Sequence, residues 1–377
     1  MAVYDQPKTS YSDTTPQKRV VSDVISLISP RDTPFLAWGG LANESKFRLV
    51  NWPSTAYEVL EDALDPLDSE LLNGSITSTA TTITVDDASA NQIGDVLLID
   101  SEYMVVSAID TATQIVTVYS RTYGGTAATH ADDAAISIVG MARLEGADSS
   151  PGPLVDITSR TNYTQIFHKE LKVARSSIRL TQYGISDEFD YQANKAVPSL
   201  MRKLEKAAIH GVSSAGTATA PRSFAGMKAR INVAGANTVS AGGAIVQADF
   251  EDALEAAYND GGMPSMALVS PANMQVIKNL YDSASFLRVQ REDTTVGMVI
   301  NRVSTPFGDV DLLIDRWMPN AQVWILDERH VGMITFYPFT QEPLAKVGDF
   351  ERAEVVGEFG FVMRHDTTAH AGIVAIS

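Results

Sequence analysis

The chain has 377 residues, of which 45% are hydrophobic and 20% are charged, the balance of an ordinary folded protein of two or three domains. It has no cysteine, which excludes disulfides, thiolate nucleophiles and cysteine metal ligands. The formal net charge is −17, so the average surface repels a phosphate backbone and argues against a protein that grips nucleic acid. The polar start lacks a signal-peptide core, and no apolar run approaches a membrane span. We therefore expect a soluble protein made in the cytoplasm, with no membrane contact.

The first 45 residues have the pattern of an arm. Residues 1–20 are polar and contain two prolines, so alone they have too little apolar surface to fold, and we expect a neighbour to order them. Ser22 is a candidate N-cap for a short helix over 23–29, which Pro30 ends. Residues 46–62 have the pattern of extended chain.

Residues 75–139 form a distinct module in the sequence. Five short strand-like runs alternate with turns, which predicts a small all-β unit. The module contains no lysine, and Arg121 is its one arginine. Its acidic residues are Asp86, Asp87, Asp95, Asp100, Glu102, Asp110, Asp132 and Asp133.

A long helix is predicted from Ser186 to Gly211. Ser186 is the candidate N-cap, acidic residues follow in the first turn, and Gly211 suits the C-terminal end. The apolar positions keep one helical phase across Pro198, so we expect a single helix with a kink. This predicted stripe comprises Phe189, Ala193, Val197, Leu200, Leu204 and Ala208.

The C-terminal part alternates helices and strands. Residues 249–260 and 270–281 are predicted helices, the second with Ser270 as N-cap and Pro271 as its first residue. Strand patterns occupy 266–270, 309–315 and 322–327, and the residues after 327 have the pattern of further strands.

No catalytic or metal-binding motif emerges from the sequence. There is no glycine-lysine phosphate loop, no paired-histidine helix and no G-x-S-x-G nucleophile turn, since Gly211–Gly216 has the wrong spacing. We expect no catalytic, cofactor-binding or metal site and no enzyme activity. Several candidates have a simpler structural interpretation as packed, exposed-strand or turn residues: His330, His365, His370, Asp309, Asp311, Asp315, Gly124, Gly125, Phe336, Tyr337, Phe339, Phe359 and Phe361.

Several ordered stretches resemble the major capsid proteins of tailed bacteriophages, in a branch formerly of unknown function. They cover most of the chain outside residues 75–139 and carry the resemblance by their order and spacing. The stretches are DTPF from Asp32 to Phe35, the motif Glu145-Gly146 with Asp148, RTNYTQIFHKELKVA, LEKAAIHG, PRSFAGMKARI and LAKVGDFERAEVVGEF.

The resemblance implies an α+β capsid fold of the Hong Kong 97 type (HK97-like), with a small all-β domain inserted in its extended hairpin loop. The expected function is a major capsid protein whose pentamers and hexamers build an icosahedral shell around double-stranded DNA. The expected domains are an N-terminal arm at 1–45, the extended loop at 46–185 carrying the β domain at 75–139, the spine helix and peripheral domain at 186–240, an axial domain at 241–325, and peripheral strands at 326–377.

The same resemblance implies the partners. The protein is expected to bind itself, with possible cementing, scaffolding and portal proteins, and to touch packaged DNA weakly and without sequence preference. It is expected in the virion capsid, after synthesis in the host bacterial cytoplasm. The alternative is another phage virion or tail protein, or a surface adhesion subunit, but a long helix beside long strands favours the capsid.

Overall fold

The structure is a computed structural model that describes residues 32–39, 54–64, 70–180, 185, 187–232, 236–283 and 302–377. The chain divides into two compact units, which we call the β unit (Leu60–Arg160) and the main unit (the rest of the chain). Helices and strands are mixed along the chain, which confirms the predicted α and β content. The predicted helix at 23–29 and the extended chain at 46–53 lie outside the described residues.

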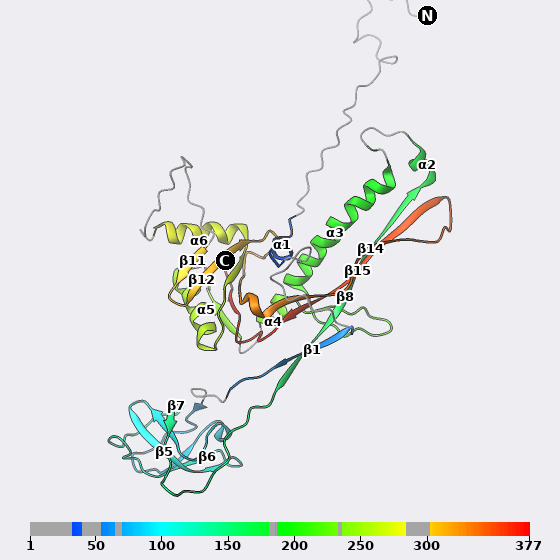
Figure 1. The fold of residues 1–377 in the computed structure, drawn as a ribbon. Coiled ribbons are helices and arrows are strands. Elements are labelled where there is room, and N and C mark those ends of the chain that lie inside the picture. Colours follow the sequence, from blue (N-terminus) through cyan, green and yellow to red (C-terminus); the bar gives the residue numbers. More distant parts are fainter. Residues whose placement is uncertain are drawn as a thin grey trace, which may run out of the picture. The chain divides into compact units, whose positions relative to one another are not determined.

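A four-stranded sheet runs through the main unit (Figure 1). Its order is β1-β8-β15-β14, and β15 pairs antiparallel with both β8 and β14. Burial alternates along β8, where Phe167 and Leu171 are buried while His168 and Glu170 are exposed. One face of this sheet therefore contributes to a core. The strands are β1 (Ala56–Glu61), β8 (Thr158–Ala174), β14 (Val331–Pro343) and β15 (Phe350–Met363).

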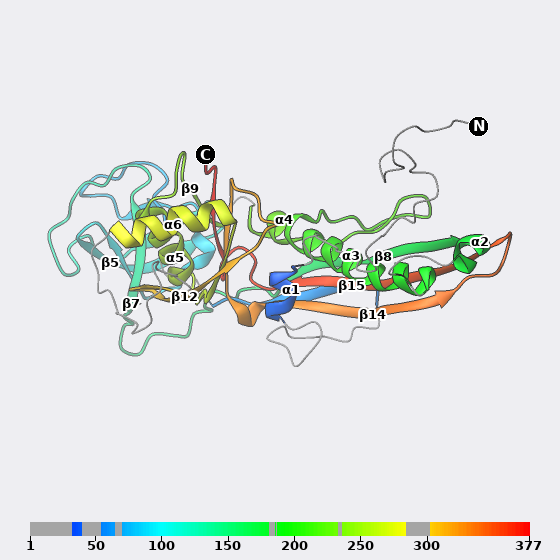
Figure 2. The ribbon, with the colours of Figure 1, turned by 90° about the horizontal axis from the view of Figure 1, so that it is seen from above.

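Helix α3 (Glu188–His210) runs alongside this sheet (Figure 2). Its N-cap is Asp187, whose carboxylate accepts the N–H groups of Phe189 at 2.7 Å and Asp190 at 3.1 Å. The prediction of Ser186 as the cap is wrong by one residue, because Asp187 already has extended backbone and carries the charge that the helix dipole favours.

Glycine ends α3 for a reason other than a left-handed turn. Gly211 has φ −53°, but a Cβ there would lie 2.5 Å from the carbonyl oxygen of Ala207 and 2.7 Å from that of Phe224. The predicted end of the helix is confirmed, and the close approach of two backbone segments explains the glycine.

The apolar stripe of α3 is largely as predicted. Leu200, Leu204 and Ala208 are fully buried, and the helix is continuous across Pro198. Val197 was wrongly placed in the stripe: it is 41% exposed, and its neighbour Ala196 is buried instead. With 3.6 residues per turn, either position 196 or position 197 can continue the stripe from Ala193 to Leu200. Only the packing against the rest of the core decides that position 196 is the buried one. Phe189 and Ala193 pack against the same core.

A second sheet of six strands has the order β11-β12-β10-β13-β16-β9. The pairs β10–β12 and β16–β9 are parallel, and the others are antiparallel. The strands are β9 (Asn237–Ser240), β10 (Met266–Val269), β11 (Arg302–Thr305), β12 (Gly308–Ile314), β13 (Val323–Leu326) and β16 (Ala371–Val374). Four of its strands, β10 to β13, come from the segment 241–325 and its end, whereas β9 precedes this segment and β16 follows it.

This sheet separates two cores, which explains why its central strands are apolar at every position. Met266 and Leu268 of β10 belong to the core shared with α3, whereas Ala267 and Val269 belong to a core formed with α5 (Gln247–Asn259) and α6 (Pro271–Ser283). The predicted cap of α6 is confirmed, because the Ser270 hydroxyl accepts the N–H of Asn273 at 3.2 Å.

The β unit contains a six-stranded sheet of order β2-β7-β4-β5-β6-β3. Leu72 and Val85 form a bridge between the continuations of the two edge strands, so the sheet closes on itself around its own core. Its strands are β2 (Glu70–Leu71), β3 (Thr82–Thr84), β4 (Asp95–Ile99), β5 (Glu102–Asp110), β6 (Ile115–Val118) and β7 (Ala135–Met141). The shorter elements of the two units are α1 (Pro34–Gly39), η1 (Ala88–Ala90), α2 (Arg175–Arg179), α4 (Met227–Ile231) and η2 (Glu328–His330).

Candidate functional site

The short helix α1 is held on α3 by a carboxyl group. Pro34 begins α1 and has no N–H, so Phe35 and Leu36 carry the first N–H groups of the helix, which need an acceptor outside it. The Glu205 carboxyl accepts both, with 2.7 Å to Phe35 N and 3.0 Å to Leu36 N. All three residues are buried. A side chain about 170 positions away in sequence therefore caps α1.

A second buried carboxyl faces Glu205. Asp315 follows β12 and is fully buried. Its Oδ1 accepts the N–H of Trp317 at 2.7 Å, whereas its Oδ2 has no hydrogen-bond donor among the described residues. A proton on Glu205 supplies the missing donor. We call Glu205, Asp315 and residues 32–39 the α1 joint.

The protonation of this pair follows from its surroundings. Burial raises the pKa of Glu205 to about 8, and the nearby Asp315 charge acts in the same direction. Burial also raises the pKa of Asp315. Two unpaired carboxylates at one dry site repel each other, so at neutral pH the pair shares one proton, held on Glu205.

Further contacts hold the same joint. Arg316 pairs with the Asp32 carboxylate at 2.9 Å, and the indole N–H of Trp317 donates to the Asp32 carbonyl at 3.0 Å. Lys206 lies 4.6 Å from the centre of the Trp317 ring, and a ring nitrogen of His210 lies 3.0 Å from the Trp317 carbonyl oxygen. The DTPF stretch is thus tied to α3 and to the segment after β12.

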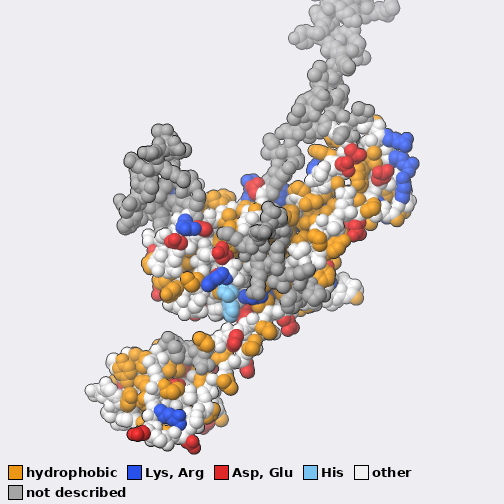
Figure 3. All heavy atoms as spheres, viewed as in Figure 1, with side chains coloured by type: hydrophobic (Ala, Val, Ile, Leu, Met, Phe, Trp, Pro, Cys, Tyr) orange, Lys and Arg blue, Asp and Glu red, His pale blue; other side chains and the backbone are white. Residues whose placement is uncertain are grey.

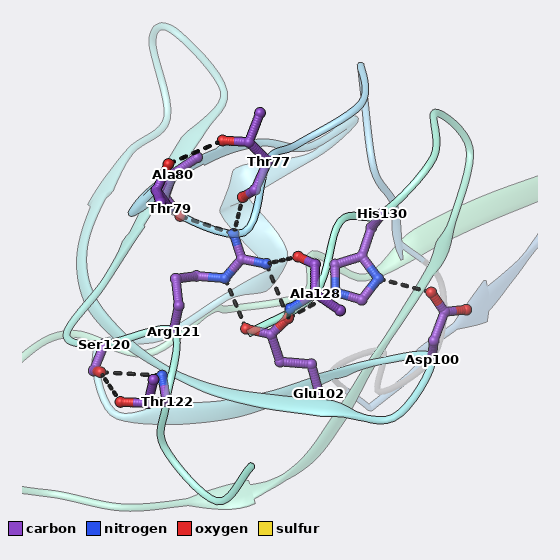
Figure 4. A network of polar contacts seen from close by, with 10 residues as sticks. All are labelled: Thr77, Thr79, Ala80, Asp100, Glu102, Ser120, Arg121, Thr122, Ala128 and His130. Atoms are coloured by element: carbon purple, nitrogen blue, oxygen red, sulfur yellow. Dashed lines mark hydrogen bonds and ion pairs between the residues drawn. The ribbon is translucent and has the colours of Figure 1, made fainter. Parts of the chain in front are cut away.

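A second polar cluster lies inside the β unit (Figure 4). Arg121 and Glu102 form a two-pronged ion pair, at 2.8 Å from Nε to Oε1 and 2.9 Å from Nη2 to Oε2. The remaining guanidinium donors reach the carbonyl oxygens of Thr77, Ala80 and Ala128. Both charged side chains are at most 4% exposed. Every N–H of Arg121 is therefore used inside the protein.

His130 extends this cluster to the surface. One ring nitrogen lies 2.9 Å from Glu102 Oε2, and the other lies 2.7 Å from the Asp100 carboxylate, which is 68% exposed. Burial alone would raise the pKa of Glu102, but hydrogen bonds from Arg121, the Ala128 N–H and His130 outweigh it and lower the pKa to about 2. Through Arg121, the cluster links Glu102 of β5 to the segments that carry Thr77, Ala80 and Ala128. This role is structural.

The structure brings two of the three singled-out histidines together. The rings of His330 and His365 lie edge to face at 5.3 Å. His370 is fully buried; one ring nitrogen accepts the N–H of Asp327 and the other donates to the Arg364 carbonyl, which leaves neither for a metal. Burial lowers the pKa of His370 to about 4. The described residues contain no group of three or more His, Cys, Asp or Glu placed to hold a metal ion.

The three aspartates around β12 have two different roles. Asp309 and Asp311 lie on the solvent side of the strand and pair with Arg302 at 3.9 Å and 2.6 Å, which confirms their interpretation as residues of a half-exposed strand. Asp315 does not belong to this pattern, because it is buried opposite Glu205. Sequence reasoning missed the pair, although a glutamate directly beside the buried Leu204 was the available signal.

The remaining candidates are structural. Phe359 and Phe361 are buried in the main core, as their alternation predicted. The centre of the Phe339 ring lies 4.8 Å from the centre of the Phe359 ring. Phe336 and Tyr337 are both more than a third exposed, because the pairing of β14 with β15 shifts register beside them. In the β unit, Gly124 has φ +116° and makes a turn against Tyr103, and Gly125 follows it.

Comparison with known proteins assigns the family. A family model described as SU10 major capsid protein matches residues 8–377, nearly the whole chain. The chain belongs to the SU10 major capsid protein family. It is also 21% identical over 294 residues to the major capsid protein of Escherichia phage Phieco32, covering 64% of this chain and 83% of that protein.

Solved structures agree on the fold. This capsid protein aligns with a chain of the cyanophage A-1(L) capsid at TM-score 0.57 and 14% identity, covering 98% and 99% of the two chains. It aligns with a chain of an empty GTA particle capsid at TM-score 0.54 and 11% identity, covering 99% and 100%. The predicted resemblance to tailed-phage capsid proteins of the HK97-like fold is therefore confirmed.

The family is structural and is not a class of enzymes. None of the helices in the described ranges is long and apolar enough to cross a membrane.

Proposed function

We propose that this capsid protein assembles into pentamers and hexamers that build an icosahedral shell around a double-stranded DNA genome. The observation that carries the proposal is the family match over residues 8–377. Exposed apolar side chains in the β unit add support, since a neighbouring subunit would remove them from water (Figure 3). The most exposed are Leu154 at 94%, Leu64 at 93%, Leu60 at 69% and Ile157 at 63%.

Electron microscopy of the purified protein tests this proposal. We expect rings of five or six subunits, or closed shells, when the protein is concentrated. Fibres or small trimeric particles would instead support the alternative of a tail or adhesion subunit. Thin sections of virions with a labelled antibody would then locate the protein in the capsid or elsewhere.

The charge of the chain supports a weak contact with the genome. With a net charge of −17, isolated subunits should bind duplex DNA weakly and without sequence preference at physiological salt. Scaffolding, portal and cementing proteins are the other proposed partners. Tight, sequence-specific binding to DNA would contradict this function.

We further propose that the β unit is a domain inserted in the extended loop, on the outer surface of the shell. Its two ends lie close together, since Glu61 and Arg160 approach to 3.7 Å, and it has a core of its own. Between residues 75 and 139, the only cationic side chain apart from histidine is the buried Arg121. Six aspartates are exposed there, a charge that would repel DNA inside the shell: Asp86, Asp87, Asp100, Asp110, Asp132 and Asp133.

Deletion of residues 75–139 tests the role of the β unit. With a short Gly/Ser linker in their place, we expect the main unit to fold and particles to form, because the main core lies in other residues. The particles should resist heat and osmotic shock less well, since contacts between neighbours would be lost. Complete unfolding of the variant, or density for the β unit inside the shell, would contradict the proposal.

A further inference from the structure

The α1 joint buries two carboxyl groups, and neither has a cationic hydrogen-bond partner among the described residues. Glu205 and Asp315 are both fully buried, and the hydrogen bonds they accept come from backbone N–H groups. One oxygen, Asp315 Oδ2, depends on a proton held by Glu205. Loss of this proton would leave two carboxylates side by side in a dry site, which destabilises the joint.

The charged groups around the pair are occupied elsewhere. Arg316, after β12, pairs with Asp32, which precedes α1. On α3, Lys206 lies over the Trp317 ring, and His210 reaches the Trp317 carbonyl. His210 favours the charge of Asp315 from a distance, but no hydrogen bond joins them among the described contacts. These groups therefore leave the second negative charge uncompensated.

Among the elements that meet at the pair, α1 is the one that can leave. It has six residues, whereas α3 has 23, and Asp315 is tied to the second sheet by its own N–H on the Val269 carbonyl at 2.9 Å. Withdrawal of α1 uncovers Glu205 and lets water reach both carboxylates.

We propose that the α1 joint is a pH-sensitive attachment, in which residues 32–39 stay on the main unit while Glu205 and Asp315 share one proton and detach when that proton is lost. The sign follows from linkage. In the attached state burial raises the pKa of Glu205 to about 8, whereas in water the pKa returns to its ordinary value of 4.5. The attached state thus holds the extra proton between these values. Detachment becomes easier as pH rises through this window and levels off above it.

Hydrogen–deuterium exchange of a peptide covering residues 33–39 measures the detachment in the full-length, unassembled protein. Between pH 5 and pH 8, after correction for the intrinsic pH dependence of exchange, we expect its protection to fall by at least about tenfold, the change per pKa unit of linkage. Protection of a peptide containing β10 should stay constant. A flat profile for residues 33–39, or an equal fall in β10, would overturn the proposal.

Glu205→Gln is the diagnostic variant. An amide at position 205 has no proton to lose; its oxygen can accept an N–H of α1 and its nitrogen can donate to Asp315 Oδ2, so the fall in protection should disappear. Asp309→Asn, an exposed carboxyl of β12, is the matched control and should keep the wild-type profile. If Glu205→Gln does not fold, Asp315→Asn decides: it removes the neighbouring charge that adds to burial in raising the pKa of Glu205, so the fall should become smaller. A fall of wild-type size in whichever of these variants folds would overturn the proposal.

Discussion

Replacing Leu204 by aspartate is expected to destabilise the main unit by roughly 4 kcal/mol or more. Leu204 is fully buried in the core that α3 shares with both sheets. The substitution removes a large apolar side chain and places a carboxylate in an apolar core. A typical domain has a net stability of about 5–15 kcal/mol, so most of the variant should be insoluble or fail to assemble.

Val197→Asp is the control on the same helix. Val197 is 41% exposed, and its side chain lies outside the buried stripe. We expect a change within about 0.5 kcal/mol, as for ordinary surface substitutions. Urea unfolding of the unassembled subunits compares the two variants. A stable, assembling Leu204→Asp protein would mean that α3 packs differently from the structure.

Glu102→Gln is expected to destabilise the β unit by about 3–5 kcal/mol, the effect of removing one partner from a buried ion pair. The amide leaves the Arg121 guanidinium without its counter-charge at a site where both side chains are at most 4% exposed. One carboxylate oxygen accepts hydrogen bonds from Arg121, the Ala128 N–H and His130, and the other accepts the Nε–H of Arg121, so an amide nitrogen in either place would face a donor. Hydrogen exchange in β4 and β5 measures the loss directly.

Asp100→Asn is the matched control for this cluster. Asp100 lies 2.7 Å from the other ring nitrogen of the same histidine, but its side chain is 68% exposed, so we expect an effect below about 1 kcal/mol. An equal effect of the two substitutions would show that burial of the Glu102–Arg121 pair is unimportant.

Acid provides an independent check on Glu102. Its pKa in the folded protein is about 2, below the ordinary value of 4.5, so the folded state binds fewer protons than the unfolded state between these values. The contribution of Glu102 to stability is therefore complete above pH 4.5 and is lost as pH falls toward 2. After correction for the intrinsic pH dependence of exchange, protection in β4 and β5 should fall over this range in the wild type, and less so in Glu102→Gln.

Local signals in the sequence predicted the long helix and the main strands. The period of apolar residues, the glycine after His210 and the Ser270-Pro271 pair depend on residues within one or two turns, and these features were found in the structure. The family resemblance, carried by ordered motifs such as DTPF, was also available from the sequence. Fine phase was not: Ser186 and Val197 were each assigned one position away from Asp187 and Ala196, because the neighbouring surface selects between adjacent residues.

The sequence by itself thus determined the element types, the family and the absence of cysteine chemistry. Tertiary structure alone decided which acidic residues are buried and what they meet. Glu205 caps a helix about 170 positions away, and Glu102 meets Arg121 19 positions away. Their ionisation depends on loss of water and on the groups brought beside them, and both are set by chain packing over distances that no local pattern encodes. The same residue type therefore has its pKa raised in the main unit and lowered in the β unit.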